Sequence, residues 1–376
     1  MDFSLSEEQE MLKKTAHDFL TKECPPSFVK ETIKDERGYS IDMWKKMADL
    51  GWMGLIFPEP YGGMEGSFLD ITVLLEEMGK ASLISPFFSS VILGGLALLE
   101  GGNEKQKDTF LPKVIQGDVL FTLAITEPNG KYSSDGIEST AAKSGEGYII
   151  NGTKLFVPYA HVADHIVIVA RTGNGLGPDG ITLFIVDSKT PGITYTPLIT
   201  IAGEKEFEVT LDQVEVSYES VLGDLNRGWP IIEKVWPKVI VAKCAEMVGG
   251  AQQALEIAIN YAKEREQFGR PIGTLQAVQH FCSDMVTDVD ACRYITYQAA
   301  WMLSCGYPCA KEVAMAKAWC SDAFKRVTAK GQQIHGAIGF TEEHDLHLYY
   351  KNAKSWELLY GDSTFHREIV AQQMGM

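Results

Sequence analysis

The stretch REQFG at residues 265–269 closes a long run of helical periodicity and decides how the C-terminal part of the chain is organised. A second stretch, QIHGAIGF at residues 333–340, follows another such run. Apolar residues recur at the spacing of one helix face over residues 239–265, 275–302, 309–329 and 365–373. Because long helices with short links pack as antiparallel neighbours, these runs predict a helical bundle.

The middle of the chain has a different character. Residues 119–126 form a β-rich run, and Asn151-Gly152 predicts a two-residue turn between strands at 148–150 and 153–157. In that hairpin Lys154 is expected to be a surface charge. Short strands without intervening helices predict a small barrel or sandwich, and further candidates are 166–170, 181–186, 193–196 and 207–216.

The N-terminal part is again helical. Ser6 and Gln9 fit a capping box, and a helix carrying Met43 and Met47 is expected to end at Gly51. The chain therefore predicts an α+β protein with three domains: an N-terminal helical domain at 1–118, a central β-barrel domain at 119–227 and a C-terminal four-helix bundle at 228–376.

Composition narrows the class of function. The net charge of −16 argues against a nucleic-acid partner, because phosphate binding needs a basic surface. We expect no membrane span, since no run of 18 apolar residues occurs, and the polar, acidic N-terminus predicts a cytoplasmic protein. Seven cysteines without zinc spacing predict free thiols, and His344 with His347 lacks a third ligand, so no metal site is expected.

Five stretches together carry a resemblance. They are PEPYGG at 58–63, Thr126-Glu127-Pro128, IINGTK at 149–154, REQFG at 265–269 followed by Gln276, and QIHGAIGF at 333–340. In this order and spacing, the chain resembles the acyl-CoA dehydrogenase family of flavoproteins along its whole length. The resemblance implies an acyl-CoA substrate, a tetramer of this chain or of this chain with a homologous one, and FAD between the β-domain and the C-terminal helices.

The resemblance also implies which residues hold FAD. Thr126 is similar to the threonine that hydrogen-bonds the flavin pyrimidine, and Arg265 to the arginine that meets the pyrophosphate. The remaining cofactor residues implied in this way are Phe268, Gln276, Gln333, Gly336 and Gly339. Taken alone, Arg265 also fits a cation at a helix C-terminus, the two glycines fit a helix end, and Thr126 fits a strand hydroxyl.

The chain departs from the family where the catalytic base belongs. Counted without gaps from Gly339, the family's glutamate falls on Tyr360, and a phenol of pKa near 10 is a poor base. The alternative position on the preceding long helix falls on Val239, which cannot accept a proton. Pro158 also stands where many members have a threonine that meets the flavin.

Two other carboxylates are therefore candidates for the base. Asp362 lies two residues beyond Tyr360, and Glu246 lies two helical turns beyond Val239. Either could instead serve a helix cap or a buried ion pair, and Lys243 is placed to neutralise Glu246 or to meet a second carboxylate on the substrate.

The expected function is an FAD-dependent acyl-CoA dehydrogenase that oxidises a bulky, cyclic or branched acyl-CoA and passes electrons to an electron-transfer flavoprotein. Tyr360, Lys243 and either Ser133 or Ser134 are expected to line the substrate site. Two alternatives remain open: a non-catalytic or half-site subunit of a heteromeric dehydrogenase, and a flavin-dependent elimination enzyme or oxidase.

Overall fold

The computed structural model describes residues 4–173, 175 and 177–376, and its contacts divide the chain into two compact units. The bundle unit combines the N-terminal residues up to Glu31 with Ser67–Leu83 and Ile240–Met376. The sheet unit combines Thr32–Gly66 with Ile84–Val239. Each unit therefore gathers stretches that are far apart in the sequence.

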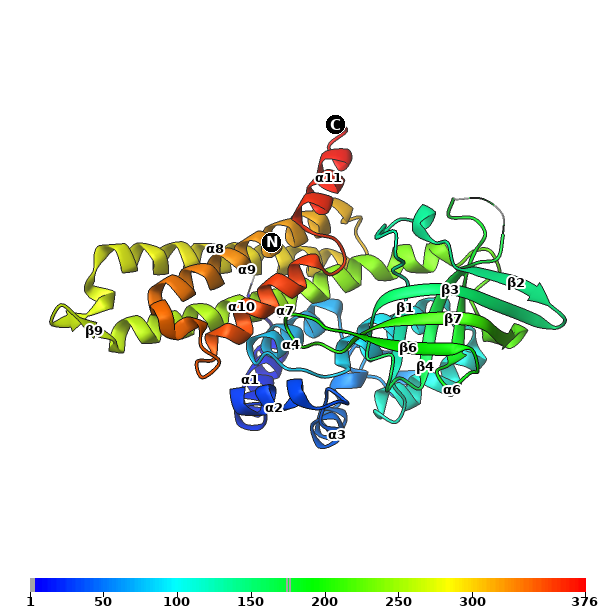
Figure 1. Ribbon diagram of the computed structural model, residues 1–376, viewed down its shortest axis with the longest axis horizontal. Helices are drawn as coiled ribbons and strands as arrows, with labels where there is room; N and C mark the ends of the chain where they lie inside the picture. Colours follow the sequence, from blue (N-terminus) through cyan, green and yellow to red (C-terminus); the bar gives the residue numbers. More distant parts are fainter. Residues whose placement is uncertain (1–3, 174, 176) are drawn as a thin grey trace. The chain divides into compact units, whose positions relative to one another are not determined.

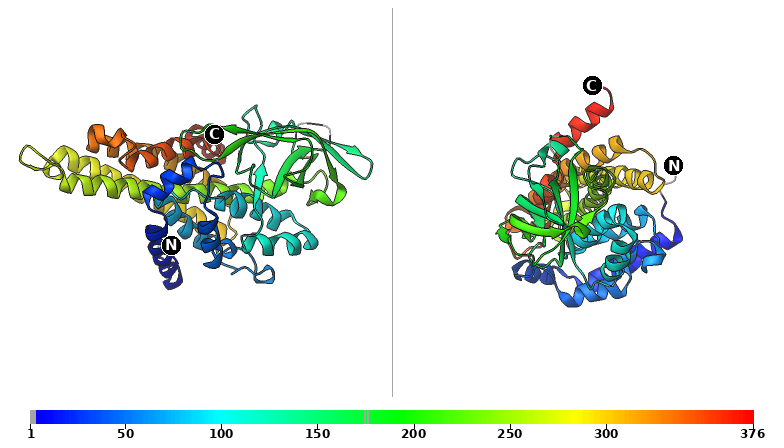
Figure 2. Two further views of the ribbon diagram at one scale, coloured as in Figure 1. Left: turned by 60° about the horizontal axis from the view of Figure 1, so that its bottom comes forward. Right: turned by 90° about the vertical axis from the view of Figure 1, so that its right-hand side faces the viewer.

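The bundle unit is helical throughout. Helices α8 and α9 pack side by side, with α10 and α11 against α9 and α4 against α8 (Figures 1 and 2). Its helices are α1 (Glu7–Glu23), α4 (Phe68–Lys80), the part of α7 (Trp229–Glu264) from Ile240 onward, α8 (Gln276–Ser304), α9 (Ala310–His335), α10 (Leu346–Leu358) and α11 (Ser363–Gln373). Helix α2 (Pro26–Lys34) begins in this unit.

Two glycines let α4 and α7 approach each other closely. A Cβ on Gly249 of α7 would lie 1.8 Å from the carbonyl oxygen of Glu76, and one on Gly79 of α4 would lie 2.1 Å from that of Glu246. Each helix thus presents a glycine to the backbone of the other. This contact fixes how the part of α7 with Lys243 and Glu246 lies against α4, because both residues are within about two turns of Gly249.

The sheet unit is built around one eight-stranded sheet of order β6-β7-β3-β2-β4-β5-β8, with β1 pairing β4 in parallel (Figure 1). The strands are β1 (Phe121–Ala124), β2 (Thr140–Ser144), β3 (Gly147–Pro158), β4 (His165–Arg171), β5 (Ile181–Asp187), β6 (Ile193–Leu198), β7 (Glu206–Ser217) and β8 (Val221–Leu222). Helical elements of the same unit are α3 (Ile41–Asp49), the π-helix η3 (Phe88–Gly95), α5 (Leu96–Gly101) and α6 (Glu104–Ile115).

Several local predictions are confirmed. Ser6 and Gln9 form a capping box at the start of α1, and α3 ends before Gly51, which adopts φ 76°. The fold is α+β, with N-terminal helices, a middle sheet and a C-terminal helical bundle.

The predicted Asn151-Gly152 turn is wrong. These residues lie inside β3, where Gly152 adopts φ 152° and the register against β7 shifts between Ile150 and Gly152. The chain reverses direction earlier, between Ser144 at the end of β2 and Gly147 at the start of β3. Asn151 instead accepts hydrogen bonds from the main chain and side chain of Gln213 at 2.8 and 2.9 Å. It lies opposite a bulge of β7, where Asp212 and Gln213 face one residue of β3.

Candidate functional site

The REQFG stretch forms a short hairpin between α7 and α8. Strands β9 (Glu266–Gln267) and β10 (Arg270–Pro271) pair antiparallel, and Phe268 and Gly269 between them adopt φ 56° and 76°. Positive φ at both central residues fits a tight hairpin turn but is unfavourable for phenylalanine. The Phe268 side chain is also 89% exposed. A strained, exposed aromatic residue is expected where a ligand or partner covers the ring.

Arg265 and Gln276 flank this hairpin. The Arg265 backbone is fixed at both ends, since its N–H donates to Tyr261 at 2.8 Å and its carbonyl accepts from Ile272 at 2.8 Å. Among the residues that the structure describes, no carboxylate pairs with its guanidinium. Gln276 is the first residue of α8, whose N-terminus has no side-chain cap. An unpaired guanidinium near an uncapped helix N-terminus suits a pyrophosphate.

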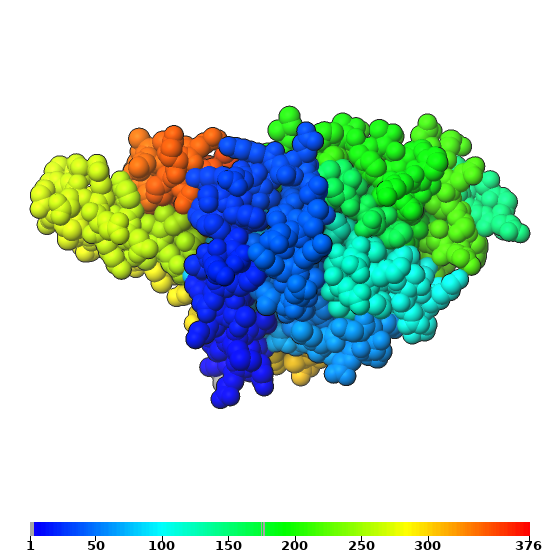
Figure 3. Space-filling model, turned by 90° about the horizontal axis from the view of Figure 1, so that it is seen from below, coloured from blue at the N-terminus to red at the C-terminus, as the bar shows by residue number. Residues whose placement is uncertain are grey.

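The chain around residue 270 lies at the surface of the bundle unit, where Figure 3 shows it in yellow-green. Arg265, Phe268 and Gln276 are all exposed there. These residues are therefore accessible to a bound cofactor.

The QIHGAIGF stretch begins in α9 and leaves it at Gly336. Gly336 adopts φ 65°, and a Cβ built on it would meet no heavy atom within 4 Å, so its main chain is open to a ligand. Gly339 is different, because a Cβ there would lie 2.6 Å from Oε1 of Gln332. That buried Oε1 has no hydrogen-bond partner among the described residues, whereas Gln333 is exposed.

Ring stacking joins this stretch to the hairpin. The Tyr261 ring of α7 stacks on the His335 ring of α9 with centroids 4.2 Å apart. The open glycine, the unpaired guanidinium and the exposed Phe268 thus follow the two helices, α9 and α7, that this ring contact joins. This set of groups fits FAD, which offers phosphates to the cation and flat rings to the aromatic side chain.

Thr126 lies in the sheet unit beside a buried ion pair. Its carbonyl accepts from the Leu155 N–H at 2.8 Å, and the Glu127 carboxylate lies 2.5 Å from the Lys154 ammonium. The prediction that Lys154 is a surface charge is wrong, because its side chain has no exposed surface. It shares the buried face of β3 with Tyr148 and Ile150, and Glu127 compensates its charge there.

Ser133 and Ser134 lie in the loop before the short helix at Ser134–Gly136. The Ser133 hydroxyl donates to the Asp135 carboxylate, which also pairs with Lys131 at 2.7 Å. Ser134 uses its carbonyl to accept from Nη2 of Arg171 at 2.7 Å. The loop that carries both predicted substrate residues is therefore held by its own charges and by β4.

Lys243 and Glu246 form a close pair on α7. The Lys243 ammonium lies 2.5 Å from Oε2 of Glu246, and it faces the Trp356 ring of α10 at 5.0 Å from the centroid. Both charged side chains are nearly buried. The structure therefore places the two residues together, in the neutralising arrangement considered from the sequence.

Tyr360 and Asp362 lie in the loop between α10 and α11. Tyr360 adopts φ 61°, the left-handed region that costs a residue with a side chain about 1 kcal/mol or more. Asp362 is the N-cap of α11, and its Oδ1 accepts from the Phe365 N–H at 2.8 Å. Its Oδ2 makes no hydrogen bond to a described residue.

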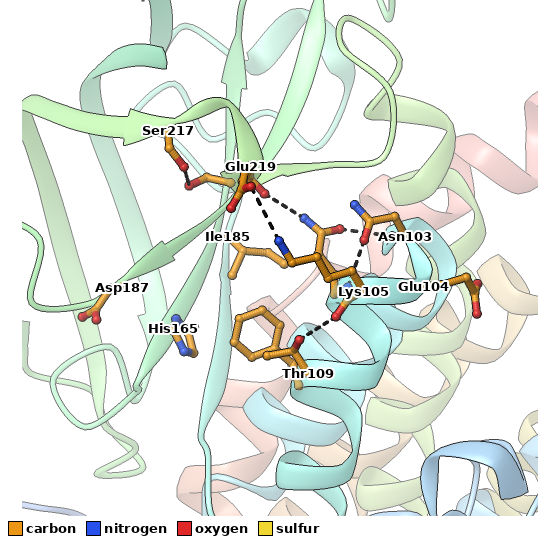
Figure 4. Close-up of a pocket in the computed structure, with 12 residues that line it drawn as sticks. Asn103, Glu104, Lys105, Thr109, His165, Ile185, Asp187, Ser217 and Glu219 are labelled. Carbon is orange, nitrogen blue, oxygen red and sulfur yellow. Dashed lines mark hydrogen bonds and ion pairs between the residues drawn. The ribbon is translucent and has the colours of Figure 1, made fainter. Parts of the chain in front are cut away.

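A groove of 710 Å³ in the sheet unit contains none of the predicted site residues. It lies beside the N-terminus of α6 and the edge of β5, with Lys105 and Glu219 pairing across it at 3.6 Å (Figure 4). Both charged side chains are more than 80% exposed. Because none of the predicted cofactor or substrate residues lines it, the groove is not taken as the candidate site.

Sequence reasoning missed two buried side chains that hold the Tyr360 loop, Lys317 and His366. Lys317 donates to the carbonyls of Glu357 and Gly361, and His366 to that of Tyr360. The sequence pattern could have indicated that Lys317 is buried, because it shares a helix face with the apolar Val313, Cys320 and Phe324. A lysine in an apolar stripe must find acceptors inside the fold.

Over the ranges that the structure describes, no group of three His, Cys, Asp or Glu residues is arranged to hold a metal ion. Each helix in those ranges is too short or too polar to span a lipid bilayer.

Three family models cover almost the whole chain. The acyl-CoA dehydrogenase N-terminal domain matches residues 6–118, the middle domain residues 122–214 and the C-terminal domain residues 226–375.

Individual proteins match over their full length. A probable acyl-CoA dehydrogenase, YngJ of Bacillus subtilis, is 34% identical over 100% of both chains. CarC, a subunit of the caffeyl-CoA reductase-Etf complex of Acetobacterium woodii, is 30% identical over 97% of this chain and 98% of its own. A chain in the ChsE4-ChsE5 complex of Mycobacterium tuberculosis superposes with a TM-score of 0.91 at 27% identity, covering 100% of this chain and 99% of that one.

The family models and the full-length relatives agree: the chain belongs to the acyl-CoA dehydrogenase family and is an FAD-dependent oxidoreductase.

Proposed function

We propose that this protein oxidises an acyl-CoA thioester with a bulky, cyclic or branched acyl group to an enoyl-CoA, and that its electrons pass to an electron-transfer flavoprotein. The observation that carries the proposal is the loop at Tyr360–Asp362, which keeps a carboxylate within two residues of the family's base position. The name of the relative CarC, which includes an Etf complex, supports the electron acceptor.

FAD, when bound, supplies a two-electron acceptor for the hydride of the β-carbon. Arg265 would neutralise the pyrophosphate, and Phe268 would cover a flat ring of the cofactor. Gln276, Gln333, Gly336 and Gly339 would contribute donors and close main-chain approach. Thr126 would donate to the flavin pyrimidine from the sheet unit.

We assign the base to Asp362. Its Oδ1 is committed to capping α11, but its Oδ2 is available to accept the α-proton of the thioester. Glu246 is the rival, and its pairing with Lys243 at 2.5 Å weighs against it, because an ammonium in contact stabilises the carboxylate and makes it a weaker base.

The acyl group would meet aromatic surface. Tyr360 falls where the family's carboxylate is expected and brings a ring to that position. An aromatic ring there favours a flat or bulky acyl group through area burial. Lys243, over the Trp356 ring, and Ser133 or Ser134 would complete the substrate site.

A second candidate is a half-site subunit in a heteromeric dehydrogenase, with a homologous chain completing a hetero-tetramer. The observation that favours it is that Asp362 and Glu246 each have a structural role already, as a helix cap and as an ion-pair partner. The similarity to a chain of the ChsE4-ChsE5 complex agrees with this alternative.

Anaerobic titration of the purified flavoprotein with straight, branched, aromatic and cyclic acyl-CoA esters separates the candidates. The lead proposal predicts bleaching of the flavin absorbance by this chain alone, and preference for bulky esters. No bleaching by any ester, with bleaching restored by a homologous partner chain, establishes the half-site subunit. Fast reoxidation by oxygen with no effect of electron-transfer flavoprotein identifies an oxidase.

A further inference from the structure

Lys317 is a lysine without exposed surface in the bundle unit. Its ammonium donates to the Gly361 carbonyl at 2.8 Å, the Glu357 carbonyl at 2.9 Å and the Ser321 hydroxyl at 3.1 Å. No carboxylate of a described residue lies within ion-pair distance of it. A buried lysine bound mainly to main-chain carbonyls has a geometric role, because its acceptors fix where the backbone must lie.

Two of these acceptors lie at one corner of the fold. Glu357 is in the last turn of α10, where carbonyls have no partner within the helix, and Gly361 is in the loop that follows. Lys317 therefore ties the end of α10 to the loop, and its positive charge is favourable at a helix C-terminus.

His366 holds the same loop from α11. The Tyr360 carbonyl lies 3.0 Å from Nε2, so Nε2 carries the proton and donates it. The ring is fully buried. Adjacent carbonyls, those of Tyr360 and Gly361, are thus held by side chains from different helices, α11 and α9.

The loop needs this support. Tyr360 is in the left-handed region, and Gly361 follows with φ 96°. A Cβ on Gly361 would lie 2.4 Å from the Phe365 ring and 3.0 Å from Nε2 of His366. A strained conformation of this kind persists only where the surroundings determine it.

We propose that Lys317 and His366 are positioning residues of the active site, which clamp the Tyr360–Asp362 loop so that its phenol and carboxylate meet the acyl group. This inference rests on the proposed function, because it takes that loop to face the substrate. A base acts only within about 3 Å of its proton, and a displacement of about 1 Å can reduce the rate roughly a hundredfold.

The test compares the full-length holoenzyme with Lys317→Met and, as a matched control, Lys325→Met. Lys325 lies on the same helix and contacts the same residue, but it binds the Glu357 carboxylate and not the loop backbone. The first readout is amide hydrogen exchange of residues 359–366 without substrate, and the second is kcat against KM with an ester that bleaches the flavin.

In Lys317→Met we expect the amide hydrogens of Phe365 and His366 to exchange at least about tenfold faster than in wild type, while exchange in α8 is unchanged. It should lower kcat roughly a hundredfold while KM and the Kd for FAD stay within about threefold. Lys325→Met should match wild type in both readouts. If Lys317→Met does not fold, His366→Leu removes the other donor and should give the same loop signature.

If amide exchange of residues 359–366 is unchanged in Lys317→Met, Lys317 does not hold the loop and the proposal is overturned. Faster exchange with an unchanged kcat would show that Lys317 holds the loop but has no effect on catalysis, which overturns the proposed positioning role. If wild type bleaches with no ester, the proposed function and the catalytic role fail together, while the exchange data still decide whether the clamp exists.

Discussion

Glu127 and Lys154 form an ion pair of 2.5 Å that is buried in the sheet unit. The two partners are not equivalent. Glu127 also accepts hydrogen bonds from the main-chain N–H groups of Glu138 at 2.8 Å and Ser139 at 3.1 Å. The Lys154 ammonium, in contrast, has no hydrogen-bond partner besides Glu127 among the described residues. Burial lowers the pKa of Lys154, with Glu127 opposing that effect.

Removing Glu127 should therefore reduce the free energy of unfolding more than removing Lys154. Glu127→Leu strands a buried ammonium and should reduce the free energy of unfolding by about 3–5 kcal/mol. Lys154→Met should cost less, because the remaining carboxylate keeps its main-chain donors. Urea unfolding measures both, with the exposed Lys143→Met of neighbouring β2 as control. Equal losses would contradict the asymmetry.

Asp362 can be tested as base and as cap separately. Asparagine caps a helix as well as aspartate does, so Asp362→Asn should keep α11 stable but lower flavin reduction at least about a hundredfold. Asp362→Ala should show the same rate loss and also destabilise the protein by about 1 kcal/mol. Anaerobic stopped-flow absorbance and thermal unfolding measure the two effects. Normal flavin reduction by Asp362→Asn would shift the assignment to Glu246.

Arg265 should contribute to cofactor affinity and not to folding. Arg265→Gln removes a charge-assisted contact worth about 1.5–3 kcal/mol, so the Kd for FAD should rise roughly ten- to a hundredfold. Reconstitution of the apoprotein, followed by flavin fluorescence, measures the Kd. Lys263→Gln, an exposed change near the end of the same helix, should leave it unaltered. An equal rise in both variants would point to general electrostatics.

His366 should make the protein sensitive to acid. Burial lowers the pKa of its imidazole to about 4, from about 6.5 in an unfolded chain. Between these values the unfolded state binds more protons, so stability is full above about pH 6.5 and declines as the pH falls toward 4. The loss should reach roughly 3 kcal/mol at pH 4. Urea unfolding of wild type and His366→Leu across this range should show their difference shrinking; parallel curves would refute the prediction.

The glycine contact between α4 and α7 predicts opposite outcomes at two helical glycines. Gly249→Ala forces a methyl group against the Glu76 carbonyl and should cost about 1–3 kcal/mol. In Gly331→Ala on α9 the new methyl group would meet Leu346 methyl groups at 3.4 Å and the Ala254 carbonyl oxygen at 3.9 Å, and alanine favours a helix, so the change should be neutral or stabilising. Thermal unfolding distinguishes them, and a stable Gly249→Ala would mean that the two helices separate readily.

Much of the fold was available from periodicity and caps. The capping box at Ser6 and the helix ending before Gly51 depend on neighbouring residues alone, so local sequence predicted them. The predicted Asn151-Gly152 turn is wrong because the dipeptide also fits inside a strand opposite a bulge, and pairing of β3 with β7 decided between these outcomes.

The sequence by itself determined the family and the cofactor, since these depend on residue types in order. Only the tertiary structure decided that Lys154 is buried against Glu127, that Glu246 pairs with Lys243, and that Lys317 and His366 hold the Tyr360 loop. The contacts of Lys154 and Lys317 join residues distant along the chain, whereas the other two lie within α7 and between Tyr360 and His366. Such partners are chosen by packing and by the need to satisfy buried charges, which no local pattern encodes.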